Sequence, residues 1–300
     1  MLKRLITGAV YVGVIVGFFF LRIVDVRLFG ILIYAFSLIG TWEMVHAFNH
    51  ERTDEAGNKI PPAMRLCTSQ QIAVYIYAIL FTPTFYIVEH FVPGAGYRGM
   101  LVLSFTFAVA LFCLLVVDSS QTDLSGTGAA MMCGFYPTAI LSTMLLANNF
   151  PEASTLALLL IFVISPVADT FAFLVGSIFR GRKLCPSISP NKTVSGAIGG
   201  VVFGTGASVL LYYVYALGSG YVYAGKANPW VMFAILGFCC SLLIEFGDLV
   251  ESVIKRKLGI KDMGKILPGH GGILDRIDGT LFASTFVYIV FALFIVQTGL

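Results

Sequence analysis

Long runs of apolar residues alternate with short polar connections along this chain of 300 residues. A helix that crosses a bilayer needs about 20 predominantly apolar residues, and roughly nine runs reach that length. They lie near residues 5–24, 28–48, 71–92, 98–117, 128–147, 154–179, 195–217, 229–254 and 279–298. The pattern predicts an all-α, polytopic integral membrane protein with about nine transmembrane helices.

The runs are continuously apolar rather than alternating, and they are longer than the strands of a membrane barrel, so β structure is not expected. The first run follows MLKR without a small-residue cleavage site, which predicts an uncleaved span rather than a signal peptide. The sequence shows no internal repeat. We therefore expect a single membrane domain over 1–300, with apolar spans in 1–150 and the catalytic polar groups in 165–280.

Composition agrees with this prediction, because 58% of the residues are hydrophobic and only 12% are charged. A soluble core of this size could not hide so much apolar surface. If nine spans alternate, one side of the membrane carries fifteen of the nineteen Lys and Arg residues, and the other side carries only Arg22, Arg27, Arg98 and Lys226. Because basic loops stay cytoplasmic, the amino terminus is expected inside and the carboxyl terminus outside.

The first polar group lies at the end of the eighth run. On a helix, Asp248, Ser252 and Lys255 are spaced i, i+4, i+7, with Glu245 and Glu251 on the same stripe. A carboxylate at membrane depth is costly and usually has a functional role. The alternative is an ion-paired helix end whose lysine side chains reach toward the interface.

The second polar group is the stretch KDMGKILPGHGGILDRID, which ends at Asp278. Its glycines, Gly269, Gly271 and Gly272, allow the backbone to approach a ligand closely and to point amides at an anion. Asp275 and Asp278 stand i, i+3, which suits a hard divalent cation such as Mg²⁺. The alternative is a tight turn in which Asp278 caps the last helix.

The third polar group follows Asp169, which lies inside the sixth run. The loop after that run contains four basic residues and no acidic one: Arg180, Arg182, Lys183 and Lys192. Thr193 can then cap the next helix, whose amino terminus could bind a phosphate.

The charge balance indicates one kind of ligand. Between Lys255 and Asp278 there are six basic and three acidic residues, a balance of +3 that equals the formal net charge of the chain. Unbalanced cations suit a polyphosphate, and the aspartates suit the Mg²⁺ that accompanies it. The sequence therefore predicts nucleotide or phosphate chemistry at a membrane surface, with no nucleic-acid partner.

The segment from Ser252 to Asp278 resembles the signature of the phosphatidate cytidylyltransferases. The resemblance continues upstream through G-D-L-x-E-S (247–252), through Asp169, Ala172 and Gly176, and to S-P-N-K-T (189–193). One departure is Ser195, where many relatives have a glutamate. The first half of the chain resembles the family only in being composed of apolar spans.

The resemblance implies that CTP and phosphatidic acid react in the lipid bilayer to give CDP-diacylglycerol and pyrophosphate, with Mg²⁺ as cofactor. It implies catalytic roles for Asp248, Asp275, Lys255 and Lys261. It implies metal ligation by Asp248, Asp275 and Asp278. It implies a substrate-binding set of Lys192, Thr193, Ser189, Ser252, Arg256, Asp262, His270, Gly271, Gly272, Arg276 and Asp169. The expected location is the cytoplasmic membrane of a bacterium, with the site facing the cytoplasm, and a homodimer is left open.

The transfer of a cytidylyl group to phosphatidic acid suits a site made of cations and carboxylates. The second pKa of a phosphate monoester is about 6, so phosphatidate is already largely a dianion at neutral pH and needs no strong general base. The obstacle to the reaction is the repulsion between this dianion and the polyanionic triphosphate of CTP. Catalysis should therefore consist mainly of positioning and charge neutralisation.

Two other classes are alternatives. An ion-coupled transporter would use carboxylates within spans, and the first half offers Glu43, Glu89, His46 and His90. A CDP-alcohol phosphotransferase would carry D-G-x-x-A-R, a pattern that Asp278 and Gly279 begin but that residues 280–283 do not continue.

Overall fold

The structure is a computed structural model that describes residues 2–53, 59–60, 62, 64–223, 225, 227–269 and 271–295. Over these residues, nine helical segments are long and apolar enough to cross a membrane. They coincide with the nine predicted runs, so the prediction of an all-α polytopic membrane protein is confirmed. The strands of the described chain are confined to two short hairpins.

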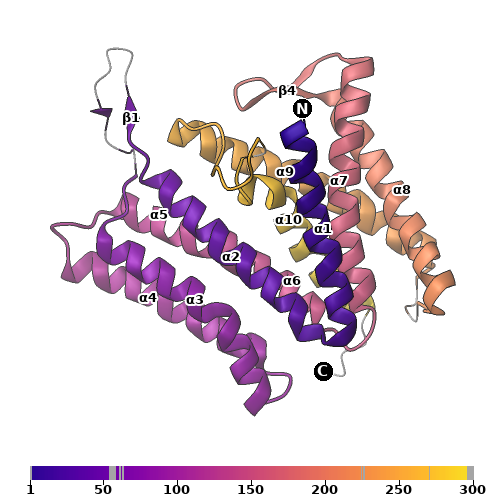
Figure 1. Cartoon of the computed structure of the whole chain (residues 1–300), viewed down its shortest axis with the longest axis horizontal. Helices are drawn as coiled ribbons and strands as arrows, with labels where there is room; N and C mark the ends of the chain where they lie inside the picture. The colour runs from indigo at the N-terminus through magenta and orange to yellow at the C-terminus, as the bar shows by residue number, and fades with distance from the viewer. Residues whose placement is uncertain are drawn as a thin grey trace. The chain divides into compact units, whose positions relative to one another are not determined.

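The chain divides into two compact units. The first unit comprises Met1–Ser142 together with Lys255–Asp275. Its elements are α1 (Leu2–Val24), α2 (Val26–Phe48), β1 (Arg52–Thr53), β2 (Lys59–Ile60), α3 (Thr68–Phe91), α4 (Gly96–Val117), α5 (Leu124–Gly134) and the π-helical turn η1 (Phe135–Ala139). Figure 1 shows α3 and α4 side by side, and they pack against each other. Residues 255–275, which we call the polar segment, therefore lie in the same unit as the amino-terminal spans.

Hydroxyl groups fix α2 against η1 inside the first unit. Thr138 contacts both Ser37 Oγ (3.0 Å) and Thr41 Oγ1 (3.1 Å), and these side chains are buried. In a membrane such bonds join helices because the hydrocarbon offers no other partner. Pro137 lies in the same turn, and because it has no N–H, a regular helical bond is lost there. α2 is thus held at the middle of its length.

The second unit comprises Thr143–Ile254 together with Arg276–Leu300. Its elements are most of α6 (Ile140–Asn148), α7 (Ser154–Phe179), β3 (Lys183–Cys185), β4 (Ser189–Thr193), α8 (Val194–Ser219), the body of α9 (Pro229–Leu258), the body of α10 (Leu274–Val290) and the π-helical turn η2 (Phe291–Ile295). The prediction of a single membrane domain stays a prediction.

α7 and α8 pack along each other (Figure 1) through small residues. A Cβ atom on Gly200 would lie 3.0 Å from the carbonyl oxygen of Ala168 and 3.2 Å from Ala172 Cβ. Gly196 approaches Gly176 in the same way. Small residues let membrane helices approach closely, so Ala172 and Gly176 are packing residues of this pair.

The basic loop after α7 is folded rather than irregular. β3 and β4 pair in an antiparallel hairpin, in which Lys183 faces Thr193 and Cys185 faces Ser189. Thr193 Oγ1 accepts a hydrogen bond from the Gly196 amide (3.1 Å), which confirms the prediction that Thr193 caps the next helix. The hairpin therefore leads directly into α8 and gives Lys192 a defined backbone.

Candidate active site

A glycine orders the carboxyl end of α9. The helix ends at Leu258, and Gly259 follows with φ +69°, a left-handed conformation that glycine adopts without steric cost. The Ile260 amide donates to the Lys255 carbonyl oxygen (3.0 Å), and the Gly259 amide donates to that of Arg256 (3.2 Å). These two bonds form a Schellman motif. The motif fixes the backbone that carries the last basic turn of α9, whose charges also complement the helix dipole.

A tight turn follows in the polar segment. Leu267 and Gly271 exchange two backbone hydrogen bonds of 2.9 and 3.1 Å. Gly269 has φ +80° and Gly271 has φ +90°, so glycine is favoured at both positions. A Cβ atom on Gly271 would also lie 2.8 Å from Asp275 Oδ2. His270, which was predicted to bind substrate, lies outside the described residues.

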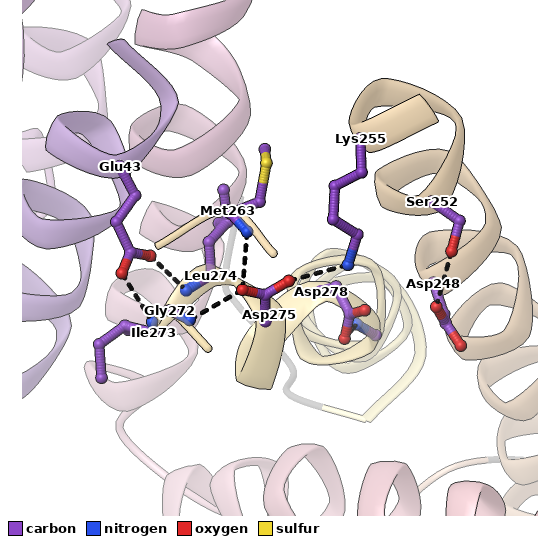
Figure 2. Close-up of polar contacts among 11 residues, drawn as sticks. Glu43, Asp248, Ser252, Lys255, Met263, Gly272, Ile273, Leu274, Asp275 and Asp278 are labelled. Carbon is purple, nitrogen blue, oxygen red and sulfur yellow. Dashed lines mark hydrogen bonds and ion pairs between the residues drawn. The ribbon is translucent and has the colours of Figure 1, made fainter. Parts of the chain in front are cut away.

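Asp275 is the centre of this segment. Its Oδ2 accepts hydrogen bonds from the Met263 amide (2.9 Å) and the Gly272 amide (2.8 Å), and its Oδ1 accepts one from Lys255 Nζ (2.8 Å), as Figure 2 shows. Only 4% of the Asp275 side chain is exposed. The Gly272 amide, which the sequence suggested for a ligand anion, thus donates to Asp275. Asp275 thus links the backbone at Met263 and Gly272 to Lys255 in the last turn of α9.

A second carboxylate holds the start of α10. Glu43, on α2, accepts hydrogen bonds from the Ile273 amide at Oε1 (3.0 Å) and from the Leu274 amide at Oε2 (2.8 Å) (Figure 2). α10 begins at Leu274, so the alternative in which Asp278 caps this helix is wrong. Asp278 Oδ1 instead accepts from the Gly279 amide (2.7 Å). Glu43 therefore satisfies the amide of Leu274, the first residue of α10, and that of Ile273 directly before it.

The second unit contains its own charged cluster. Lys192 Nζ lies 2.7 Å from Glu245 Oε2 and 2.7 Å from Asp248 Oδ2. Ser252 Oγ donates to Asp248 Oδ1 (3.3 Å) along α9. Burial lowers the pKa of Lys192, but the Asp248 and Glu245 carboxylates outweigh this and raise that pKa above its ordinary value. Lys192 is therefore a cation at neutral pH.

Asp169 belongs to the same cluster. On α7, it interacts electrostatically with Asp278, Asp248 and Glu245, which repel its negative charge, and with Lys192, which attracts it. The structure thus brings together three predicted site aspartates and one predicted site lysine within the second unit. Glu245 joins them, although sequence reasoning placed it on the stripe without selecting it for the site. Its spacing three residues before Asp248 was the available signal.

Asp248 and Asp278, with Asp169 beside them, offer the hard carboxylate oxygens that Mg²⁺ prefers, so this donor set fits the ion in kind. Within the described ranges, no three His, Cys, Asp or Glu side chains form a group that could hold a metal ion. The Lys192 ammonium, rather than an assembled set of ligands, balances these carboxylates.

The other predicted site residues fall into two classes. Thr193 is buried as a helix cap and Ser189 is half-buried at the start of β4. The remaining charged ones are exposed, namely Arg256, Lys261, Asp262 and Arg276. Lys192 and Lys255, in contrast, are part-buried and paired with carboxylates.

Comparisons with known proteins agree with one another. The model of the "Cytidylyltransferase family" matches residues 2–294. The chain is 29% identical to the phosphatidate cytidylyltransferase of Bacillus subtilis over 294 residues, which are 98% of each chain. It is 31% identical to that of Mycobacterium bovis over 304 residues, covering 97% of this chain and 89% of the relative. It is 35% identical to that of Brucella abortus over 198 residues, covering 66% and 68%.

Proposed function

Because the chain belongs to the cytidylyltransferase family, we propose that it transfers the cytidylyl group of CTP to phosphatidic acid. A phosphate oxygen of phosphatidic acid forms a bond to the α-phosphorus of CTP. The bond from this phosphorus to the oxygen that bridges to the β-phosphorus breaks, and pyrophosphate leaves. The protein is then a nucleotidyltransferase of phospholipid biosynthesis that works in the membrane.

The observation that carries this proposal is the full-length similarity to phosphatidate cytidylyltransferases, which covers 98% of both this chain and the Bacillus subtilis protein. The family model spans residues 2–294, a range that includes parts of both units and the positions of all the predicted site residues. The charged cluster of the second unit and the Asp275 segment of the first unit supply the type of groups that this reaction needs. They are carboxylates and cations on the membrane-spanning helices and in the loops beside them.

In this reaction the residues act by binding and neutralising charge. Phosphatidate is largely a dianion already, since the second pKa of a phosphate monoester is about 6. The cations of each unit would bind phosphate groups of the substrates, namely Arg256 and Lys261 in the first unit and Lys192 and Arg276 in the second. Mg²⁺, when bound, would neutralise the triphosphate. In the second unit Asp248 and Asp278 would hold the ion, with Asp169. That Asp275, in the first unit, is a metal ligand stays a prediction.

The alternatives are less well supported. A transporter would use Glu43 and Glu89, but each of these carboxylates accepts two backbone amide hydrogen bonds. Glu43 accepts from Ile273 and Leu274. Glu89 accepts from Gly94 (2.7 Å) and Gly96 (2.9 Å). Such carboxylates hold the chain rather than a transported ion. The CDP-alcohol phosphotransferase pattern stops after Gly279, and the full-length relatives have a different activity in their names.

The direct test uses the purified protein in mixed detergent and lipid micelles with CTP, phosphatidic acid and Mg²⁺. We expect CDP-diacylglycerol and pyrophosphate in equal amounts, and neither product when CTP or phosphatidic acid is left out. ATP in place of CTP should give no lipid product. Failure to form CDP-lipid from the complete mixture, by protein that is folded, would refute the proposal.

A further inference from the structure

Glu43 is a buried carboxylate to which the proposed chemistry gives no role. Its side chain lies within α2 and is 0% exposed. Its hydrogen-bond donors are two backbone amides that follow it by 230 and 231 residues. An ionisable group inside a membrane helix is costly, and it is usually retained for a function.

The polar segment leaves space for this side chain. A Cβ atom on Gly264 or on Gly272 would overlap the carboxylate of Glu43, and the nearest atoms at both glycines belong to that one residue. Neither glycine has a positive φ, so the backbone conformation does not require glycine at these positions. The space for Glu43 is the reason for both glycines.

The two carboxylates, Glu43 and Asp275, divide the amides of the segment between them. Asp275 accepts from Met263 and Gly272, and Glu43 accepts from Ile273 and Leu274. Ile273 and Leu274 directly precede Asp275, so Glu43 fixes the backbone from which the Asp275 side chain extends. The Asp275 carboxylate then reaches Lys255 (2.8 Å).

The support for Glu43 comes from the amino-terminal spans. Ser37 and Thr41, on the same helix, bind Thr138 of η1 through their hydroxyls. α1 adds a contact of its own, because Thr7 Oγ1 donates to the Pro268 carbonyl oxygen (3.1 Å). The first half of the chain thus supplies rigid anchors to the polar segment.

We propose that Glu43 is a positioning residue, which sets the Asp275–Lys255 pair by holding the start of α10 from α2. The inference rests on the proposed function for its activity readout. The hold of Glu43 on the backbone at Ile273 and Leu274 can be measured without substrate. Glu43 does not touch the reacting atoms in this account, and its effect on turnover passes through Asp275.

The test compares Glu43→Gln with Glu89→Gln in the full-length protein. Glu89 is a matched control, because it too accepts two backbone amides, at the loop between α3 and α4. Glutamine keeps the size of glutamate but offers one acceptor oxygen, and its NH₂ group would face an N–H donor. We expect hydrogen exchange in peptides covering 262–275 to be about 10-fold faster in Glu43→Gln, as for the loss of one buried hydrogen bond, and unchanged in Glu89→Gln.

Turnover per folded molecule should fall by about 10-fold to 100-fold in Glu43→Gln, as expected for a displaced active-site group, and should stay normal in Glu89→Gln. On an Asp275→Asn background, Glu43→Gln should cause little further loss, because residues that act as a unit are not additive. A residue that only stabilises the fold would give additive effects and normal turnover per folded molecule.

Gly264→Ala gives an independent variant if Glu43→Gln does not fold. Its methyl group would press on the Glu43 carboxylate while leaving Glu43 unchanged. Gly128→Ala, in α5, is its control because that Cβ meets open space. Gly264→Ala should speed exchange over 262–275, and Gly128→Ala should not.

Unchanged exchange over 262–275 in both Glu43→Gln and Gly264→Ala would overturn the inference. So would full additivity with Asp275→Asn. If the wild-type protein makes no CDP-lipid, the proposed function fails alone, and the exchange measurement still decides whether Glu43 holds the segment.

Discussion

Asp275 shows how a single carboxylate can order both a loop and a helix. It accepts two backbone amides through one oxygen and the Lys255 ammonium through the other. Charge-assisted bonds of this kind are stronger than neutral ones. The substitution Asp275→Asn therefore removes the charge of this side chain and keeps its shape.

We expect Asp275→Asn to fold and to insert normally, because its amide oxygen can still accept from Met263 and Gly272. Its NH₂ group then faces Lys255, so the ion pair is lost. Turnover should fall by about 10²-fold, the scale seen when one electrostatic contact to a transition state is removed. The measurement is CDP-lipid formation per folded molecule.

Asp123→Asn is the matched control, because Asp123 caps α5 by accepting from the Gly126 amide (2.6 Å) and asparagine caps equally well. It should keep wild-type turnover and yield. Full turnover in Asp275→Asn would contradict the role of its charge. Loss of folded protein instead of turnover would reduce Asp275 to a structural residue of the loop.

At the residue scale, the sequence predicted Asp248, Asp275, Lys255 and Lys192 because charged groups stand out in apolar surroundings. It could not predict the function of Glu43, whose partners follow it by more than two hundred residues. A cap formed between distant segments has no local signal. The same holds for the Lys192 bridge to Asp248, which joins β4 to α9.

At the element scale, the predicted spans agree with the helices except at particular ends. The last span was predicted from residue 279, whereas α10 begins at Leu274, because Glu43 satisfies its first amides. The eighth span was predicted to end at residue 254, whereas α9 continues to Leu258. Hydrophobicity reports the membrane-embedded part of a helix, and both helices extend beyond it through polar residues.

The α7–α8 contact gives a prediction at this scale. In Gly200→Val, even the Cβ atom would lie 3.0 Å from the Ala168 carbonyl oxygen and 3.2 Å from Ala172 Cβ, so the branched side chain has no room between the two helices. We expect a loss of about 1–3 kcal/mol in the free energy of unfolding, the usual cost of overpacking. Thermal unfolding of the detergent-solubilised protein measures the loss.

Gly206→Val controls for the lower helix propensity of valine, since a Cβ on Gly206, in the same helix, meets no atom within 4 Å. It should be much less destabilised than Gly200→Val. Equal stability of the two variants would show that α7 and α8 do not depend on close approach at Gly200.

At the scale of the whole molecule, the polar segment from the second half of the chain packs with the first spans. The first unit takes residues 255–275 from the second half of the sequence. Sequence patterns along the chain could predict the number of spans. They could not predict that residues 255–275 pack with the first spans, because this packing depends on contacts between distant residues, such as Glu43 with Leu274. The amino-terminal spans therefore take part in holding the proposed site.

The charge distribution predicts how the molecule is inserted. Fifteen of the nineteen Lys and Arg residues fall on one side of a nine-span arrangement, and basic loops stay in the cytoplasm. A cysteine in place of Lys265, which is exposed, should react with an impermeant thiol reagent only from the cytoplasmic side. A reporter fused after Leu300 should be active only on the opposite side. A cytoplasmic carboxyl terminus would contradict this insertion.

In the reaction that we propose, the α-phosphorus of CTP becomes bonded to a phosphate oxygen of phosphatidic acid. The most direct measurement follows labelled phosphorus through the purified protein. We expect label from the α-position of CTP to appear in the lipid and label from the γ-position to appear only in pyrophosphate, with both transfers about 10²-fold slower in Asp275→Asn. Label from the γ-position in the lipid, or no labelled lipid from folded wild-type protein, would contradict the proposed transfer of the cytidylyl group.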